Sequence, residues 1–216
     1  MSGSGAERVL VVPRDALFRH VRPFDGFLPA DGVGRRLLVP IRREARFADR
    51  AAVEEDPRQK QLIPYLPLKC GDSLFLFRRH ASQDEARLRN LFSMGVGGHI
   101  NPIDGDPADA DALIAAGLLR ELREEMHVNA PFSVRFVGFL NDDANEVGAV
   151  HFGLVFRVEV PTPAVEVAEK STMSGAFAEL SEIRRRRDEM ESWSRLLLDG
   201  VESWFAASGL PWPHLS

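Results

Sequence analysis

Residues 117–128 read GLLRELREEMHV, and this short segment carries the strongest signal in the chain. Glu121, Glu124 and Glu125 follow Arg120 and place three negative charges within five residues. On a helix, positions three and four apart are neighbours, so Glu121 faces both other glutamates and each pair repels by about 0.2–0.5 kcal/mol. A hard divalent cation would relieve this crowding, because Mg²⁺ binds carboxylate oxygens. The alternative is a solvated helix face with partial pairing to arginine.

The segment falls within the best helix that the sequence predicts, over residues 106–127. Asp106 suits the N-cap position and Pro107 the first helical position. His127 is predicted to end the helix. Apolar side chains recur at the spacing of one helix face, which predicts that this face packs on a core. These side chains are Ala115, Leu118, Leu119, Leu122 and Met126.

Upstream, residues 94–100 read MGVGGHI, a predicted strand that runs into Gly97 and Gly98. Glycines at a strand end let the backbone approach a ligand closely. Together the two segments resemble the Nudix hydrolase signature, which is Gly, five residues, Glu, seven residues, then Arg-Glu-apolar-x-Glu-Glu-x-Gly-apolar. Residues 120–125, the box segment, match the start of the second half at every specified position, and Val128 matches its last apolar position.

The chain departs from this signature at two places. Counted back from Arg120, the first signature glutamate falls on Ala112, and the distance from Gly98 is eight residues too long. We hypothesise that Asp106 takes the place of the missing acid, with Asp109 and Asp111 as alternatives. The last signature glycine is His127, at a helix end where glycine would favour a left-handed C-cap.

The resemblance implies an α/β fold, a Nudix-like α/β/α sandwich with a mixed β-sheet. It also implies a metal-dependent pyrophosphohydrolase that cleaves a diphosphate linkage in a nucleoside diphosphate derivative or related compound, with Mg²⁺ or Mn²⁺ as cofactor. By resemblance, Glu121, Glu124, Glu125 and the carbonyl of Gly97 are the metal ligands. Arg120 holds a glutamate in place through a charge-assisted hydrogen bond.

Further site residues are predicted around this centre. Gly98 and His99 are the candidate substrate-binding residues, although a structural loop histidine is an equal interpretation of His99. Members of the family often draw an extra acid from a later loop, and here Glu146 is the first candidate, followed by Asp142 and Asp143. A solvated hairpin turn is the competing interpretation of that loop.

Two other functions compete with the hydrolase. A catalytically silent nucleotide-binding or regulatory Nudix domain is favoured by Ala112 and His127. An isomerase of prenyl diphosphates is a weaker alternative, because the sequence around Cys70 does not suit the cysteine that such an enzyme needs.

Several other chemically notable residues are interpreted as structural. His151 lies in an apolar strand and is predicted to be a core or sheet-face histidine. Residues 184–187 read RRRR, and because a helix cannot point four successive residues one way, a mostly solvated surface is predicted. Trp193 and Trp204 are assigned to helix packing in preference to base stacking, and Phe205 likewise.

The rest of the chain predicts strands before and after the central helix. A hairpin is expected around Cys70, formed by residues 61–69 and 72–79, and Pro64 and Pro67 place its first strand at a sheet edge. Further strands are expected at residues 8–14, 35–43, 134–140 and 147–160. Residues 181–207 are predicted to be mostly helical.

Length and composition set the remaining bounds. The 216 residues, 44% of them hydrophobic, predict an N-terminal extension with strands over residues 1–69, a Nudix-like domain over 70–207 and a tail over 208–216. The net charge of −5 argues against nucleic-acid binding, and no apolar run approaches the length of a membrane span. With one cysteine and no signal segment, we expect a cytoplasmic protein with a small-molecule diphosphate substrate. A homodimer is a further possibility, with residues 1–69 as its candidate interface.

Overall fold

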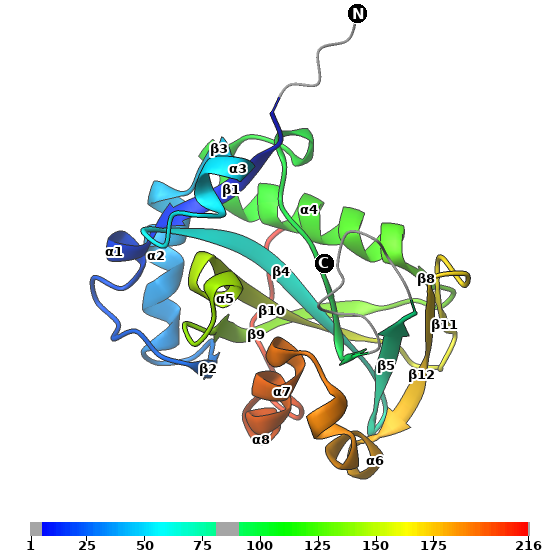
Figure 1. Cartoon of the computed structure of the whole chain (residues 1–216). Helices are drawn as coiled ribbons and strands as arrows, with labels where there is room; N and C mark the ends of the chain where they lie inside the picture. Colours follow the sequence, from blue (N-terminus) through cyan, green and yellow to red (C-terminus); the bar gives the residue numbers. More distant parts are fainter. Residues whose placement is uncertain (1–5, 81–90, 216) are drawn as a thin grey trace, which may run out of the picture.

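The computed structural model describes residues 6–80 and 91–215. Within these residues the main sheet has ten strands in the order β12-β5-β4-β10-β9-β2, with β1 and β7 paired to β4, β3 paired to β1 and β6 paired to β5 (Figure 1). A separate two-stranded sheet joins β8 to β11. The strands of the main sheet are β1 Arg8–Pro13, β2 Gly26–Pro29, β3 Arg46–Asp49, β4 Gln59–Cys70, β5 Ser73–Arg79, β6 Phe92–Ser93, β7 Gly95–Gly97, β9 Ser133–Asn141, β10 His151–Glu159 and β12 Met173–Glu179. The small sheet consists of β8 Met126–Val128 and β11 Val165–Val167.

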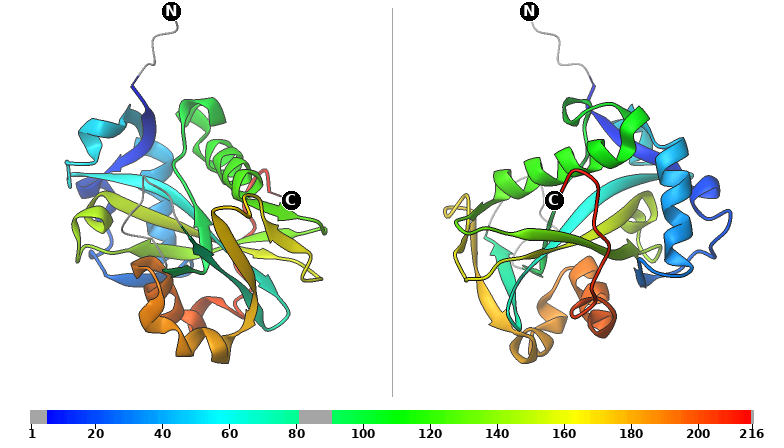
Figure 2. Two further views of the ribbon diagram at one scale, coloured as in Figure 1. Left: turned by 45° about the vertical axis from the view of Figure 1, so that its right-hand side comes forward. Right: turned by 180° about the vertical axis from the view of Figure 1, so that it is seen from behind.

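Helices cover both faces of this sheet, as the views in Figure 2 show. On one face α4 packs against β4 and β7, and on the other α7 contacts β2 and β9. The helices are α1 Arg14–Leu17, α2 Leu38–Glu44, α3 Arg50–Val53, α4 Ala110–Glu125, α5 Glu146–Val150, α6 Leu180–Arg185, α7 Ser192–Asp199 and α8 Val201–Trp204. Short 3-10 turns are η1 Gly34–Leu37, η3 Pro102–Asp104, η4 Pro107–Asp109 and η5 Arg187–Glu189. The predicted α/β sandwich with a mixed sheet is confirmed.

Alternation along the strands builds a separate core on each face. In β5, Phe75 and Phe77 join the core under α4, whereas Leu74 and Leu76 join the core under the C-terminal helices. Successive strand side chains point to opposite faces, so a strand that is apolar at every position serves two layers. This explains why the central strands read as continuous apolar runs.

The prediction that β4 is an edge strand is wrong. β4 lies between β5 and β10 and pairs in parallel with β10. Its two prolines fall where the ladder is interrupted: Pro64 lies where the antiparallel neighbour changes from β1 to β7. Pro67 lies in a gap in the β10 register. A missing N–H is tolerated at such breaks, which is why the prolines gave a misleading signal.

Residues 35–43 form η1 and α2, not the predicted strand. Leu37, Leu38 and Ile41 are buried while Val39 is 53% exposed, which is the pattern of a helix face. Pro40 stands in the first turn of α2, where its missing N–H has no intrahelical partner to lose.

The ends of the central helix also differ from the prediction. The helix α4 begins at Ala110, and its N-cap is Asp109, whose side chain accepts from the backbone N–H of Ala112. Asp106 caps the preceding turn η4 instead. The helix ends at Glu125, and His127 lies in strand β8 opposite Glu166 of β11. No left-handed residue is needed at this position, so histidine can replace the signature glycine.

The predicted hairpin around Cys70 is confirmed, with Cys70 at the end of β4. Residues 134–140 lie in β9, and the C-terminal region is helical as expected. Residues 147–160 begin with the short helix α5 before β10 starts at His151. The boundary drawn at residues 69/70 falls at the end of the central strand β4, so the extension supplies part of the main sheet. The division into domains and the homodimer stay predictions.

Candidate active site

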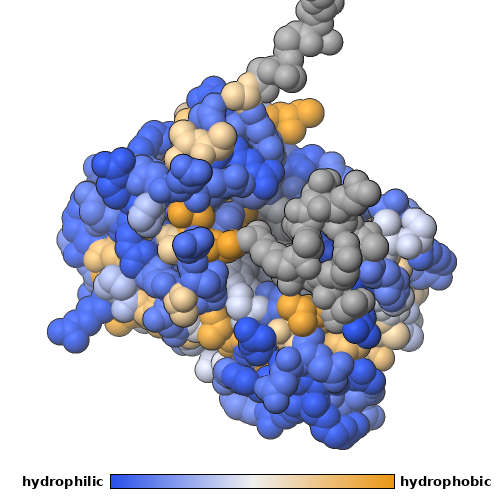
Figure 3. All heavy atoms as spheres, viewed as in Figure 1, coloured by the Kyte–Doolittle hydropathy of each residue, from blue (hydrophilic) through white to orange (hydrophobic). Residues whose placement is uncertain are grey.

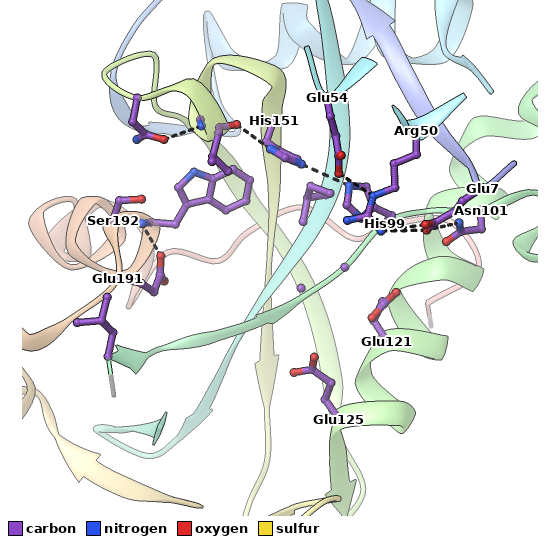
Figure 4. Close-up of a pocket in the computed structure, with 18 of the residues that line it drawn as sticks. Glu7, Arg50, Glu54, His99, Asn101, Glu121, Glu125, His151, Glu191 and Ser192 are labelled. Carbon is purple, nitrogen blue, oxygen red and sulfur yellow. Dashed lines mark hydrogen bonds and ion pairs between the residues drawn. The ribbon is translucent and has the colours of Figure 1, made fainter. Parts of the chain in front are cut away.

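Three distant parts of the chain enclose a cleft of about 680 Å³ over the glycine end of β7. Figure 4 shows Glu121 and Glu125 of α4 on one side, with Glu191 and Ser192 at the start of α7 across from them. The remaining walls come from the N-terminal region and from the α5 segment. The cleft is lined by Glu7, Arg50, Glu54, Ile63, Leu91, Gly97, Gly98, His99, Asn101, Arg120, Glu121, Glu125, Asn145, Val147, Gly148, His151, Glu191, Ser192, Trp193 and Arg195.

Glu121 lies directly against the backbone of Gly98. A Cβ atom added to Gly98 would stand 2.2 Å from the carboxyl carbon of Glu121, so only glycine leaves room for this carboxylate. The Glu121 side chain is 12% exposed. The Gly–Gly strand end therefore has a specific function in this fold, which is to let a charged group approach the backbone.

Arg120 clamps this arrangement from the other side. Its Nε and one terminal nitrogen donate to the two oxygens of Asp104 at 2.8 and 2.9 Å. The other terminal nitrogen donates to Glu121 at 2.7 Å and to Glu124 at 3.0 Å. A further bond of 2.8 Å reaches the backbone carbonyl of His99. One guanidinium thus ties α4 to the loop after β7 with fixed geometry.

Asp104, and not Asp106, Asp109 or Asp111, takes the place of the missing signature acid. The Asp104 side chain is 3% exposed and is fixed by a capping box with Asn101, whose backbone N–H donates to it at 2.9 Å. Asp106 caps the turn η4, Asp109 caps the helix α4, and Asp111 pairs with Arg42 at 2.9 Å. These three side chains are committed elsewhere, which overturns the hypothesis.

A signal for Asp104 was present in the sequence. Counted forward from Gly98, five residues separate the glycine from Asp104, as the signature requires for its first acid. The eight extra residues therefore lie between Asp104 and Arg120, and they form the turns that lead into α4. Counting only backward from Arg120 placed the insertion on the wrong side of the acid.

The box glutamates differ in their surroundings. Burial raises the pKa of Glu121 against the opposing effect of Arg120, and the charges of Glu124 and Glu125 add to the rise. The Glu124 side chain is 57% exposed and lies off the cleft wall. Glu125 lines the cleft and accepts from one nitrogen of Arg79 at 2.7 and 2.9 Å. The arginines therefore offset only part of the repulsion among the three carboxylates of the box segment.

Two histidines meet in the cleft, which the sequence did not lead us to expect for His151. Its Nδ1 lies 2.7 Å from the carbonyl of Val147, so this nitrogen donates to the carbonyl. The other ring nitrogen, Nε2, faces His99. That Nε2 lies 3.3 Å from Nε2 of His99, which is also 2.8 Å from Oε1 of Gln61 (Figure 4). Burial, the charge of Arg50 and the neighbouring ring lower the pKa of His99 to about 3, so His99 is neutral near pH 7.

The N-terminal region contributes a charged wall that sequence reasoning missed. Arg50 at the start of α3 donates to Glu7 at 3.0 Å and to Glu54 at 2.8 Å, and all three line the cleft (Figure 4). Asn101 reaches the same group through a 3.4 Å bond to Glu7. These residues carry no recognisable motif. They reach the site through the pairing of β3 with β1 and of β1 with β4.

The loop before β10 contributes through residues other than the predicted acids. Of the described residues, Asn145 and Val147 line the cleft, whereas Glu146 between them does not. Asp142 accepts from Asn145 at 2.7 Å, and Asp143 pairs with Arg14 and Lys60. A catalytic role for Glu146 stays a prediction that this placement does not favour.

The aromatic residues of the C-terminal helices divide between core and cleft. Trp204 is fully buried, as predicted, and Phe205 packs partly buried against the same core. Trp193 is partly buried and also lines the cleft, which the packing interpretation did not foresee.

The arginine run at residues 184–187 is confirmed as surface. Arg184 pairs with Glu202, Arg186 with Glu182 at 3.2 Å and Arg187 with Asp199 at 2.6 Å. In Figure 3 the part of the surface over the C-terminal helices is hydrophilic, while small apolar patches gather nearer the centre of this face.

None of the described helices is both long and apolar enough to cross a membrane.

Comparison with known proteins agrees with the class of site that this geometry defines. No family model matches the chain. Protein YmaB of Bacillus subtilis (strain 168) is 36% identical over 206 residues, which cover 93% of this chain and 100% of that protein. The crystal structure of Tm1382, a candidate Nudix hydrolase, matches with a TM-score of 0.76 and 29% identity over 90% of this chain and 98% of that one.

A weaker likeness links the chain to a bifunctional NMN adenylyltransferase/ADP ribose pyrophosphatase from Francisella tularensis, with a TM-score of 0.48 and 16% identity over 66% of this chain and 41% of that one. The box segment, the fold around it and the likeness to Tm1382 show that this chain belongs to the Nudix hydrolase family.

Proposed function

We propose that this protein hydrolyses the diphosphate linkage of a nucleoside diphosphate derivative or related compound, with a divalent cation, Mg²⁺ or Mn²⁺, as cofactor. One observation carries the proposal: the buried carboxylate of Glu121 is clamped by Arg120 against Gly98 and opens into a cleft of about 680 Å³. Clefts of roughly 300–1,000 Å³ are typical of sites for small molecules and cofactors.

The donor set fits a hard cation in chemistry. Carboxylates of Glu121, Glu124 and Glu125, with the carbonyl of Gly97, would supply the oxygen ligands that Mg²⁺ and Mn²⁺ prefer. Within residues 6–80 and 91–215, no three acidic, histidine or cysteine side chains stand close enough together to hold an ion as they are. Binding therefore requires Glu124 and Glu125 to turn from their arginine partners.

Hydrolysis joins a water oxygen to phosphorus, breaks the bridging P–O bond and releases a proton from the water. The bound cation would polarise the phosphate oxygens and lower the pKa of the water. Arg120 and Asp104 orient Glu121, so they act as positioning residues. The bonds of His99 to Gln61 and His151 hold a neutral imidazole beside Gly98, where it can contact substrate without adding charge.

A silent nucleotide-binding domain is the second candidate. The specific observation in its favour is that Glu124 and Glu125 are both paired with arginine, through Arg120 and Arg79. In that case the cleft would bind a nucleotide without hydrolysing it.

Glu121→Gln separates the two functions. Glutamine keeps the size of the side chain and removes its charge, so we expect an unchanged or higher melting temperature without metal. Turnover should fall by at least about a hundredfold, the scale for loss of one key electrostatic group. The measurement is phosphate or nucleotide release from nucleotide sugars, dinucleoside polyphosphates, coenzymes and nucleoside triphosphates, with Mg²⁺ or Mn²⁺.

Glu189→Gln is the matched control, because Glu189 is exposed and lies outside the cleft.

A cation that binds the folded state should also raise the melting temperature of the wild type, and the shift should shrink in Glu124→Gln and Glu125→Gln. Full turnover in Glu121→Gln would refute the role of Glu121, and no turnover by the wild type on any diphosphate compound would favour the silent domain.

A further inference from the structure

The cleft contains a positive charge that the proposed chemistry does not use. Its lining includes the arginines Arg50, Arg120 and Arg195. Arg50 pairs with two glutamates, and Arg120 pairs with one aspartate and two glutamates. Across residues 6–80 and 91–215, Arg195 forms no ion pair with a carboxylate. A guanidinium is always charged in a protein, so the charge of Arg195 is available to a ligand of opposite sign.

The Arg195 side chain is anchored without using most of its donors. One terminal nitrogen donates to the backbone carbonyl of Met190 at 2.7 Å, and Met190 is fully buried. In the part of the chain that the structure describes, this is the one hydrogen bond that the guanidinium makes. Because a guanidinium carries five N–H groups, an anchored Arg195 still has several of them for a ligand.

The acidic residues that flank Arg195 on α7 are occupied by other partners. Glu191, one turn before Arg195, is buried, and both of its oxygens already accept hydrogen bonds from protein groups. Asp199, one turn after Arg195, pairs with Arg187 at 2.6 Å. Neither carboxylate therefore takes the place of a ligand at Arg195.

Ser192 supplies a second donor on the same helix face. It lies three residues before Arg195, and positions three apart on a helix are neighbours. Both residues line the cleft, and the Ser192 hydroxyl makes no hydrogen bond with the other described residues. Figure 4 shows Ser192 across the cleft from Glu121. A guanidinium beside a hydroxyl at this end of the cleft can bind an anion through charge-assisted hydrogen bonds.

We propose that Arg195 and Ser192 bind a phosphate group of the substrate that is separate from its diphosphate. The substrate is then a diphosphate compound with a phosphate monoester at its far end, such as a nucleotide phosphorylated on the ribose. A phosphate suits the two side chains better than a carboxylate, because it offers three acceptor oxygens that do not lie in one plane with each other and the phosphorus. This inference rests on the proposed function for the position of the diphosphate at Glu121.

The 2′,5′- and 3′,5′-bisphosphates of adenosine test this assignment, because each differs from AMP by one phosphate on the ribose. Calorimetric titration of the wild type with Mg²⁺ should show at least one bisphosphate binding about tenfold to hundredfold more tightly than AMP, the scale of hydrogen bonds to charged groups. This preference should fall by about tenfold or more in Arg195→Gln. It should be partly kept in Arg195→Lys, which retains the charge without the planar fork, and weakened in Ser192→Ala.

Arg58→Gln is the matched control, because the Arg58 side chain is 86% exposed and lies outside the cleft. This variant should keep the full preference. A bisphosphate can also bind the cation more tightly than AMP does, but that part of the preference would remain in Arg195→Gln.

Equal binding of AMP and both bisphosphates by the wild type would overturn the proposal. An unchanged preference in Arg195→Gln, with its fold intact by circular dichroism, would do so too. A preference that depends on Arg195, without hydrolysis of any diphosphate compound, would support the phosphate site and refute the catalytic function. Hydrolysis of diphosphate compounds without a bisphosphate preference would do the reverse.

Discussion

At the scale of single residues, the site depends on one arginine and one aspartate that share two hydrogen bonds. Arg120 is only partly exposed, and Asp104 is 3% exposed. Because the pair lies behind Glu121, it sets where that carboxylate points. A buried charged group that loses its partner destabilises the fold as well as the geometry.

Asp104→Asn should therefore lower both stability and turnover. Asparagine presents one N–H group toward Arg120 and carries no charge, so the free energy of unfolding should fall by about 1.5–3 kcal/mol, as for hydrogen bonds to charged groups. Asp106→Asn is the control, since asparagine caps a turn as well as aspartate does and should change little. Urea denaturation and turnover measure the two effects. Equal losses in both variants would contradict the role assigned to Asp104.

The two glycines at the end of β7 are predicted to differ in what they protect. A Cβ at Gly98 meets the far end of the flexible Glu121 side chain, whereas a Cβ at Gly97 meets the carbonyl oxygen of Pro64 at 2.9 Å. Gly98→Ala should displace the carboxylate and reduce turnover by about a hundredfold, the scale for a 1 Å misplacement, with little change in melting temperature. Gly97→Ala should lower the melting temperature, because backbone cannot move aside cheaply. The reverse pattern in thermal unfolding and turnover would sink this distinction.

At the scale of elements, a buried ion cluster fixes the loop before β10. Lys60 of β4 is fully buried and donates to Asp143 at 2.8 Å, to the carbonyl of Gly148 at 2.9 Å and to that of His151 at 3.1 Å. Arg14 adds two bonds to Asp143. These contacts hold the segment that carries four cleft residues, Asn145, Val147, Gly148 and His151, although the side chains of Arg14, Lys60 and Asp143 do not line the cleft.

This cluster should make stability depend on acid pH. Burial raises the pKa of Asp143, but bonds from Arg14, Lys60 and Asn141 outweigh it and hold the pKa well below its usual range. A carboxyl whose pKa is lower in the folded state stabilises the protein above its unfolded pKa of about 3.9 and loses that contribution as pH falls toward the folded value.

Asp143→Asn should accordingly be less stable than the wild type by about 1.5–3 kcal/mol at pH 7, with the gap narrowing below about pH 4. Denaturant unfolding of both proteins at a series of pH values measures the gap. Asp188→Asn is the control, because the Asp188 side chain is 98% exposed and should show no gap at any pH. A gap that stayed constant down to pH 2 would disprove the linkage.

At the scale of the whole molecule, the cleft is assembled from the two ends of the chain and its middle. Arg50 lies near the N-terminus, Glu121 in the centre and Trp193 near the C-terminus. The tail also takes part, since Leu210 pairs with Phe136 and the buried Trp212 donates to the carbonyl of Asp111 at 3.0 Å.

A fragment of residues 70–207 should therefore fail to fold by itself. It lacks β4, which lies between β5 and β10, and would leave two sheet edges and both cores exposed. We expect no cooperative thermal transition and no dispersed amide signals by NMR, in contrast to the full chain. A fragment with a sharp transition would restore the division into an extension and an independent domain.

The sequence by itself determined the parts of this protein that depend on short-range periodicity. The central helix, its buried stripe around Leu118 and Leu122 and the box segment could all be predicted, because a helix brings residues three and four apart together whatever surrounds it. Strands were also found from their apolar runs, except at residues 35–43, which form η1 and α2. The family followed from these local features and from the glycines at residues 97 and 98.

Tertiary structure alone decided which distant groups meet. The contact between His99 and His151, the Arg50 wall and the position of Trp193 all depend on strand order, which local spacing does not encode. The same holds for β4, whose prolines suggested an edge until its neighbours β7 and β10 showed where the ladder breaks. Long-range pairing is set by the packing of the whole chain, so these residues gave no signal that could be read one segment at a time.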